Sequence, residues 1–439
     1  MKKVLTVLLA ITILSSILGC SPATSAEEGE VKNGEPVTLV FHALTWIKAE
    51  QEAQQALIDE WNAEHPDIQV ELILKDWGTM SQELLTSFET GDVPDIFHYS
   101  QPVISDWKDL GYLADLSPMI TEEDRADVND DIWAGLTADD GSIVGVPIQY
   151  EVDVTYYNKD IFEKYEITPP TMDDPWTFDE LITYARQLQG SEFEGFMGMT
   201  FPGIDHFGRV FPEVWAPKIG DDLVYKNDEG KYYLKLSDES VDFIGKVKGL
   251  IDEGLIGENM LVWSQDVLPE FLNGNSAMLV GYGCWYRSMF INESEGMDVV
   301  DWGVAAPLKV NQTDIYGYIQ TLSVPAASKH KEEAFEFLKW YWKPENVLAV
   351  AKAAYIMPGR NSAINDPSLN TPEYSWDLTQ QAVQHNVLPD YVQLPGWGQF
   401  SEGVATTLFG QLWAGELTLD EFVTRYESEG TKLLQEFNE

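Results

Sequence analysis

The chain has 439 residues and a formal net charge of −46, from 73 acidic and 27 basic side chains. Its apolar content of 44% is sufficient for folded cores. The chain is longer than a single hydrophobic core usually accommodates, so we expect two domains. The acidic balance makes nucleic acid and anionic lipid surfaces poor partners, because binding to either draws on positive charge.

The N-terminus has the pattern of an export signal. Lys2 and Lys3 form a short positive region, residues 4–18 are almost uninterruptedly apolar, and Gly19 supplies the small residue expected before a cleavage point. The apolar run is shorter than the ~20 residues that a membrane-spanning helix needs. We therefore interpret residues 1–19 as a signal peptide and not as a transmembrane anchor.

The signal ends in the sequence Ile-Leu-Gly-Cys at residues 17–20, which resembles the bacterial lipobox. This resemblance implies that Cys20 is acylated and anchors the exported protein to the outer face of the cell membrane. Residues 20–36 are rich in Ser, Ala, Glu and Gly, so we predict a flexible tether.

Strand and helix patterns alternate after the tether. They predict strands at 37–44, 68–74 and 95–100 and helices at 49–65 and 79–91, the second helix capped by Thr79 and ended by Gly91. This alternation predicts an α/β domain with a largely parallel sheet. Ligands of such sheets bind beyond the carboxyl ends of the strands, which directs attention to residues 44–46, residues 99–102 and the segment after the strand that ends in Gln-Tyr-Glu.

Two later helices have predicted caps. Thr177 is expected to cap a helix that carries Leu181, Ala185 and Leu188, and Ser328 to cap one whose apolar side is Ala334, Phe335, Leu338, Tyr341 and Trp342.

Cysteine and histidine are too sparse to predict cofactor chemistry. Cys284 is the only cysteine after the lipobox, so we expect no intrachain disulfide and a buried, inert thiol. The six histidines are scattered, and we expect neither a metal ion nor another cofactor.

Several stretches together resemble the extracellular solute-binding proteins of ABC importers, in the carbohydrate-binding family that includes maltose-binding protein. These stretches are FHALTWIKAEQEAQQALIDEWNAEHPDIQVEL, GSIVGVPIQYEVDVTYYNKDIFEKYEITPPTMDDPWTFDELITYARQL, FLNGNSAMLVGYGCWYRSM, GYIQTLSVPAASKHKEEAFEFLKWYW and YIMPGRNSAI. They occur in the order of that family and cover nearly the whole mature chain.

This resemblance implies two α/β lobes joined by a hinge, with a ligand cleft between them. Lobe one would be 37–151 with 314–365 and lobe two 152–313 with 366–439, the chain crossing near 151–154, 308–313 and 364–367. It also implies a monomeric lipoprotein that captures a neutral sugar, an oligosaccharide by our prediction, through lobe closure and delivers it to the membrane subunits of an ABC permease.

A sugar presents C–H faces and a belt of hydroxyls, so its site needs aromatic plates and planar polar groups. Positions at the ends of strands suggest Trp46, Tyr99, Ser100 and Gln101. The resemblance adds the hinge glutamate Glu151, the aromatic residues Trp285, Trp397 and Tyr355, either His206 or Phe207, and Arg360, which in this family more often stabilises a lobe than contacts ligand.

Two other functions remain open from the residues alone. A glycoside hydrolase needs two carboxylates about 5–10 Å apart, and Glu151 and Asp153 on one face of a strand would be about 7 Å apart. The resemblance argues against an enzyme, and no Walker loop or Gly-x-Ser-x-Gly motif is present. A sensor that presents its closed form to a receptor is the second alternative.

Overall fold

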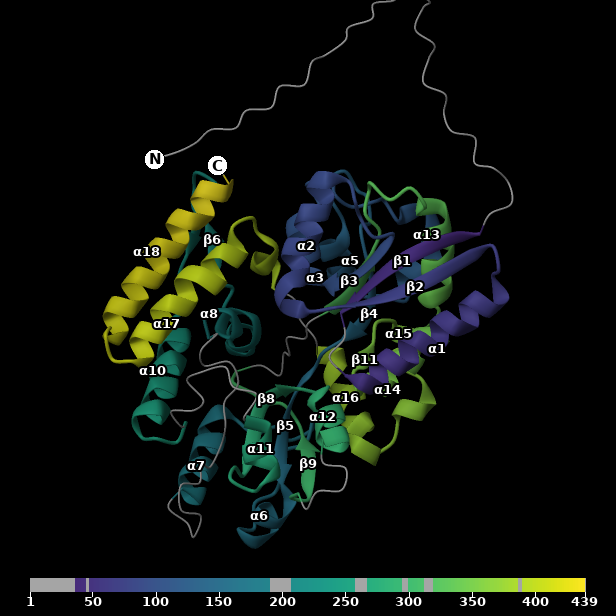
Figure 1. Cartoon of the computed structure of the whole chain (residues 1–439). Coiled ribbons are helices and arrows are strands. Elements are labelled where there is room, and N and C mark those ends of the chain that lie inside the picture. Colours follow the sequence, from purple (N-terminus) through teal and green to yellow (C-terminus); the bar gives the residue numbers. More distant parts are fainter. Residues whose placement is uncertain are drawn as a thin grey trace, which may run out of the picture. The chain divides into compact units, whose positions relative to one another are not determined.

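A computed structural model describes residues 36–44, 47–189, 207–256, 267–293, 299–311, 319–385 and 389–438 (Figure 1). Cys20 and the predicted signal peptide lie outside these residues. Within the described part of the chain, no helix is both long and apolar enough to cross a membrane.

The first sheet has six strands in the order β11-β4-β10-β3-β1-β2. Their bounds are β1 Val37–Leu44, β2 Ile68–Lys75, β3 Ile96–Ser100, β4 Val146–Tyr150, β10 Ile319–Ser323 and β11 Met357–Pro358. Strand β1 is parallel to β2 and β3, as the alternating pattern predicts. The sheet as a whole is mixed, because β10 runs antiparallel to β3 and β4, and β11 runs antiparallel to β4.

Helices precede or follow these strands along the chain. They are α1 Lys48–Glu64, α2 Trp77–Thr90, α3 Gln101–Trp107, α4 Glu122–Ala126, α5 Asp130–Leu136, α13 Lys331–Tyr341, α14 Pro344–Ala354 and α15 Asn361–Ile364, with the short turn η1 Ser117–Met119. Helices α1 and α14 pack side by side (Figure 1). Trp61 of α1 and Phe41 of β1 both contact the ring of Phe337, with centroids 5.3 and 6.2 Å away. Burial of these large rings gives the sheet its core.

The second sheet has three antiparallel strands in the order β8-β5-β9. Its strands are β5 Asp153–Asn158, β8 Met278–Gly283 and β9 Trp302–Ala305, and the helices near it in sequence are α6 Lys159–Lys164, α7 Phe178–Leu188, α10 Asp238–Asp252, α11 Val267–Leu272 and α12 Tyr286–Glu293. Only Glu151 and Val152 separate β4 from β5, so this short segment carries the chain from the first sheet to the second.

The C-terminal helices pack on a small hairpin and on a short helical segment from the middle of the chain. These elements are α8 Phe207–Val210, η2 Phe211–Trp215, α9 Ala216–Ile219, β6 Val224–Lys226, β7 Tyr232–Leu234, η8 Gln399–Ala405, α17 Thr406–Trp413 and α18 Leu419–Asn438. The connection from α15 contains η4 Pro367–Leu369, η5 Glu373–Ser375, α16 Trp376–Ala382, η6 Val383–His385 and η7 Asp390–Gln393. The ring of Phe409 contacts Phe207 and Phe422 at 5.0 and 4.6 Å, so the core of this region is aromatic.

The predicted helix ends are partly confirmed. Thr177 forms a capping box with Glu180, and Gly91 ends α2 with a φ of 75° and a 2.8 Å bond from its N–H to the carbonyl of Ser87. The prediction for Thr79 is wrong, because α2 begins at Trp77 and the Thr79 hydroxyl instead donates to Glu83.

Ser328 is not the helix cap that the sequence predicts. Helix α13 begins at Lys331, whereas the Ser328 hydroxyl donates to buried Asp95 at 2.7 Å and accepts from the backbone N–H of His330 at 3.1 Å. The hydroxyl satisfies a buried carboxylate, which is a more costly group to leave unpaired than a helix end in solvent.

The predicted burial of Cys284 is confirmed. The residue is free and fully buried, and burial raises the pKa of its thiol. A protonated thiol without solvent access has little reactivity.

Candidate ligand-binding site

Glu151 lies on the segment that joins the two sheets. Its carboxylate accepts a 2.8 Å hydrogen bond from the Gln320 amide and another from the Trp285 side chain. Burial raises the pKa of Glu151 to about 7, although these two hydrogen bonds and the positive charge of Arg209 oppose the shift. The residue as a whole is half-buried, on the segment between the two sheets.

Further polar side chains form a row across the ends of the central strands of the first sheet. Gln320 faces Ser100 on one neighbouring strand and Gln149 on the other. The Gln149 amide donates to Glu50 of α1 at 2.9 Å, and burial raises the pKa of Glu50 to about 7. His98 lies 3.1 Å from the Gln320 side-chain oxygen, and burial lowers the pKa of its imidazole to about 4. Burial of this row therefore favours the uncharged forms of Glu50 and His98.

Of the three residues predicted after the third strand, Tyr99 and Ser100 end β3 and Gln101 begins α3. The ring of Tyr99 packs between Trp77 and Trp107 at 5.7 and 5.8 Å, and its hydroxyl forms a hydrogen bond with Ser81. Ser100 and Gln101 are both buried. Both polar atoms of the Gln101 amide lack a hydrogen-bond partner among the described residues, which distinguishes it from most buried amides.

A second wall comes from α8 and the C-terminal helices. Segments η2 and η8, adjoining it, are π-helical, a geometry that often marks functional sites. Gly208 allows α8 to approach η8 and the start of α17 closely, since a Cβ there would lie 2.6 Å from the carbonyl oxygen of Ser401 and 2.1 Å from the backbone nitrogen of Thr406. The next residue, Arg209, lies 3.2 Å from Glu213 and 3.6 Å from Glu402 of η8.

Arg209 acts electrostatically on Glu151 and Tyr99, and Glu402 acts on Tyr99. The charge of Arg209 lowers the pKa of both Glu151 and Tyr99, while Glu402 raises the pKa of Tyr99, although burial is the largest influence on both pKa values. Sequence reasoning missed Arg209, Glu402 and Gln320. Arg209 lies within the stretch searched for a stacking aromatic residue, but no periodicity or motif singles out the other two.

Trp285 follows the end of β8. Its indole stacks on Tyr286 with centroids 4.0 Å apart and also reaches Glu151. A Cβ at position 283 would lie 2.5 Å from the indole nitrogen, so Gly283 makes room for this ring. The half-buried indole ring of Trp285, beside the Glu151 carboxyl, is suited to stacking on a sugar face.

Other predicted site residues have different surroundings. Phe207 and Trp397 are buried in the aromatic core, where Trp397 contacts Tyr391 at 4.9 Å. Arg360 forms ion pairs with Asp124 and Asp127 at 2.9 and 2.7 Å. In this conformation these three side chains are committed to packing or pairing and leave little surface for a ligand.

Tyr355 ends α14 in the left-handed region, with a φ of 56°. Its ring faces Trp376 at 5.9 Å, and its carbonyl accepts a 2.7 Å bond from buried Arg287. This residue is half-buried but is not joined to the Glu151 group by any of these contacts. Trp46 and His206 lie outside the described residues.

Asp153, the other carboxylate near the connecting segment, is part of a buried ion pair. Its side chain lies 3.4 Å from the fully buried ammonium of Lys218. Burial raises the pKa of Asp153, whereas Lys218 opposes that shift. In the described ranges, no group of three or more His, Cys, Asp or Glu side chains could hold a metal ion.

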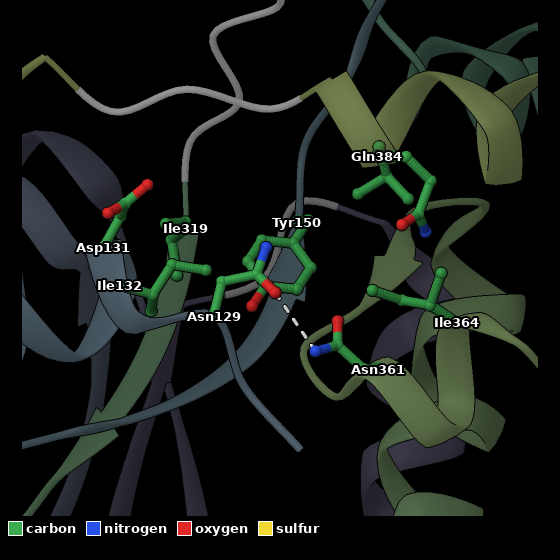
Figure 2. Close-up of a pocket in the computed structure, with 9 residues that line it drawn as sticks. Asn129, Asp131, Ile132, Tyr150, Ile319, Asn361, Ile364 and Gln384 are labelled. Carbon is green, nitrogen blue, oxygen red and sulfur yellow. Dashed lines mark hydrogen bonds between the residues drawn. The ribbon is translucent and has the colours of Figure 1, made fainter. Parts of the chain in front are cut away.

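A separate pocket lies beside the end of β4 (Figure 2). At the edge of this pocket, the side-chain amide of Asn361 donates a 3.1 Å hydrogen bond to the side-chain oxygen of Asn129. The lining residues are Asn129, Asp131, Ile132, Tyr150, Ile319, Asn361, Ile364, Val383 and Gln384. None of them is a predicted ligand-binding residue, so the candidate site is defined by its side-chain chemistry and not by this pocket.

Comparison with known proteins identifies the family. The model of bacterial extracellular solute-binding proteins matches residues 47–347. An uncharacterised lipoprotein of Streptomyces antibioticus is 28% identical over 438 residues, covering 95% of this chain and 90% of the relative. The galactooligosaccharide-binding protein of Bacillus subtilis is 22% identical, over 87% of this chain and 86% of its own.

Solved structures show the same fold. The ABC substrate-binding protein Lmo0181 from Listeria monocytogenes, in complex with cycloalternan, superposes with a TM-score of 0.75 at 22% identity, over 92% of this chain and 100% of that chain. The two-lobed fold implied by the sequence resemblance is therefore confirmed. The chain belongs to the bacterial extracellular solute-binding proteins.

Proposed function

We propose that this protein is the substrate-binding lipoprotein of an ABC importer and that it captures a neutral oligosaccharide. The observation that carries the proposal is the group around Glu151, where a carboxylate of raised pKa, an amide and a half-buried tryptophan meet at the segment between the two sheets. Relatives that bind galactooligosaccharides, raffinose and maltotriose by name support an oligosaccharide.

The charge balance of the site favours a neutral ligand. The cation that acts on Glu151 and Tyr99, Arg209, is paired with Glu213 and Glu402. A carboxylate ligand would have to compete with both glutamates. The hydroxyls of a neutral sugar can accept from Arg209 and donate to Glu151 without adding charge to a strongly acidic protein.

Capture would proceed by closure of the two lobes. Tyr99, Gln101 and Glu151 belong to the first sheet or its connection, whereas Arg209 and Glu402 come from the other predicted lobe. A ligand that touches both groups only in the closed form binds that form more tightly and so shifts the population toward it. The lobe ranges 37–151 with 314–365 and 152–313 with 366–439 belong to this proposal.

The cellular setting is also proposed. Lipidation at Cys20 would hold the monomeric protein at the outer face of the membrane, with residues 20–36 as a tether, while the closed form delivers ligand to the permease. Binding without hydrolysis belongs to this proposal, and the pairing of Asp153 with Lys218 supports it, because the carboxylate nearest to Glu151 in sequence is held in an ion pair.

A thermal-shift screen of protein beginning at Ser21 tests the proposal. Neutral mono- and oligosaccharides are compared, and each ligand that shifts the melting temperature is recovered and analysed. A ligand at a hundred times its Kd adds about 2.7 kcal/mol of stability, so a clear shift with unchanged sugar is expected. Cleavage of the sugar would favour the glycoside hydrolase alternative. If no sugar raises the melting temperature, neutral sugars are rejected as the ligand class.

A further inference from the structure

The backbone conformation of α5 does not require glycine at position 135. Gly135 lies in the last turn of the helix, and its φ is outside the left-handed region that favours glycine. Glycine in a helix is less favourable than alanine. A packing reason is therefore needed for its presence.

The neighbouring side chain supplies that reason. A Cβ at position 135 would lie 1.6 Å from the amide nitrogen of Gln101 and 2.8 Å from its amide carbon. The Ser105 hydroxyl donates to the Gly135 carbonyl at 2.8 Å and so holds α3 against α5. Glycine thus creates the space in which the Gln101 amide lies.

A second amide approaches the same space from a distant part of the chain. The side-chain oxygen of Gln393 lies 3.5 Å from the Cβ position of residue 135, and its element η7 contacts α3. Gln101 is 1% exposed, yet neither its amide nitrogen nor its amide oxygen has a partner in the described part of the chain. An unpaired buried amide is costly unless another group satisfies it.

We propose that Gln101 and Gln393 form a hydroxyl-binding subsite above Gly135, contacted by the sugar when the lobes are closed. This inference rests on the proposed function. It specifies that a hydroxyl of the ligand is bound by these two amides. Each amide offers one acceptor and donors, which matches a hydroxyl that also donates and accepts. A carboxylate only accepts and an ammonium only donates, so the subsite selects neutral sugars over uronic acids and amino sugars.

Titration calorimetry with defined probes tests the subsite. The neutral probes are raffinose, maltotriose and galactotriose; trigalacturonic acid and the trisaccharide of glucosamine are the charged ones. We expect at least one neutral probe to bind wild type at least about tenfold more tightly than either charged probe, the scale of one unmatched polar group. Gln101→Ala and Gln393→Ala should each raise its Kd by about tenfold.

Gly135→Ala should raise the Kd similarly, because the new methyl group displaces the Gln101 amide. In the double variant Gly135→Ala with Gln101→Ala, affinity should fall no further than in Gln101→Ala alone. Gly249→Ala in α10 is the matched control, since no atom lies within 4 Å of its Cβ position. It should leave the Kd unchanged, and if Gly135→Ala does not fold, the two alanine variants decide.

The outcomes separate the subsite from the function. Unchanged affinity in Gln101→Ala and Gln393→Ala, with a neutral sugar still bound by wild type, overturns the subsite alone. Equal or tighter binding of a charged probe also overturns it. If wild type binds none of the neutral probes, the proposed function fails for trisaccharides and the subsite fails with it.

Discussion

Arg360 and Glu151 are both candidate site residues from the sequence, Arg360 with a lobe-stabilising role as the more common one in the family, and their surroundings are opposite. The Arg360 guanidinium bonds to Asp124, Asp127 and the Trp342 carbonyl and also lies 4.4 Å above the Trp342 ring. Glu151 instead has an uncharged amide and an indole as hydrogen-bond partners, on a residue that is half-buried. A charged group with all its partners inside one lobe stabilises that lobe, whereas a carboxyl on the segment that joins the two sheets, held by uncharged partners, is better placed for function.

Arg360→Met should produce the largest loss of stability. Removing the guanidinium leaves the Asp124 and Asp127 side chains, 18% and 15% exposed, without their cation. Breaking a largely buried ion pair costs about 3–5 kcal/mol. Urea unfolding should show this loss, while the sugar Kd of the folded variant stays within about twofold of wild type. A tenfold change in Kd without loss of stability would instead place Arg360 in the binding site.

Glu50→Gln should change how stability depends on pH. The pKa of Glu50 is raised from its ordinary 4.5 to about 7, chiefly because the carboxyl is buried. Between those values the folded state holds a proton that the unfolded state has released, so its stabilising contribution is complete below pH 4.5 and is lost as pH rises through 7.

The variant should not show that loss. We expect wild type to lose about 1–3 kcal/mol relative to Glu50→Gln between pH 5 and pH 8, measured by urea unfolding at both values. The comparison cancels the opposite contribution of His98, whose lowered pKa adds stability as pH rises. Parallel pH profiles for the two proteins would contradict a protonated Glu50.

Glu151→Gln should separate binding from folding. The amide keeps the shape of the side chain and removes a charge that burial disfavours, so the free energy of unfolding should stay unchanged or rise slightly. Loss of a charged acceptor for ligand hydroxyls should raise the sugar Kd about tenfold, or about 1.4 kcal/mol. If calorimetry gives equal Kd values for variant and wild type, Glu151 serves the hinge and not the ligand.

The parts of the fold that depend on local patterns could be predicted from the sequence. Periodicity located β1, α1 and β2 closely, and the capping residues located the start of α7. The directions of β10 and β11 could not be predicted, because they depend on where the chain returns to the first sheet. Ser328 shows the same limit, since its partner Asp95 is 233 residues away.

The candidate site was predicted less completely for a related reason. Tyr99 and Gln101 follow a strand end, and Glu151 and Trp285 match family motifs, so they could be named. Aromatic residues such as Phe207 and Trp397 have the right chemistry for sugar stacking, but their burial depends on tertiary packing. Long-range pairs such as Arg209 with Glu402 leave no pattern in one sequence.

Glu402→Gln should have the smallest combined effect on stability and on the sugar Kd. It extends the comparison from buried charged groups to an exposed one. Its carboxylate is 68% exposed and 3.6 Å from Arg209, a separation and exposure at which an ion pair contributes about 0–1 kcal/mol. Stability should therefore hardly change. Affinity should fall about threefold, because an Arg209 with one counter-charge fewer is less firmly oriented toward the ligand. The effect should fade in high salt, which screens exposed charges; a salt-independent loss would mean that Glu402 bonds to the sugar directly.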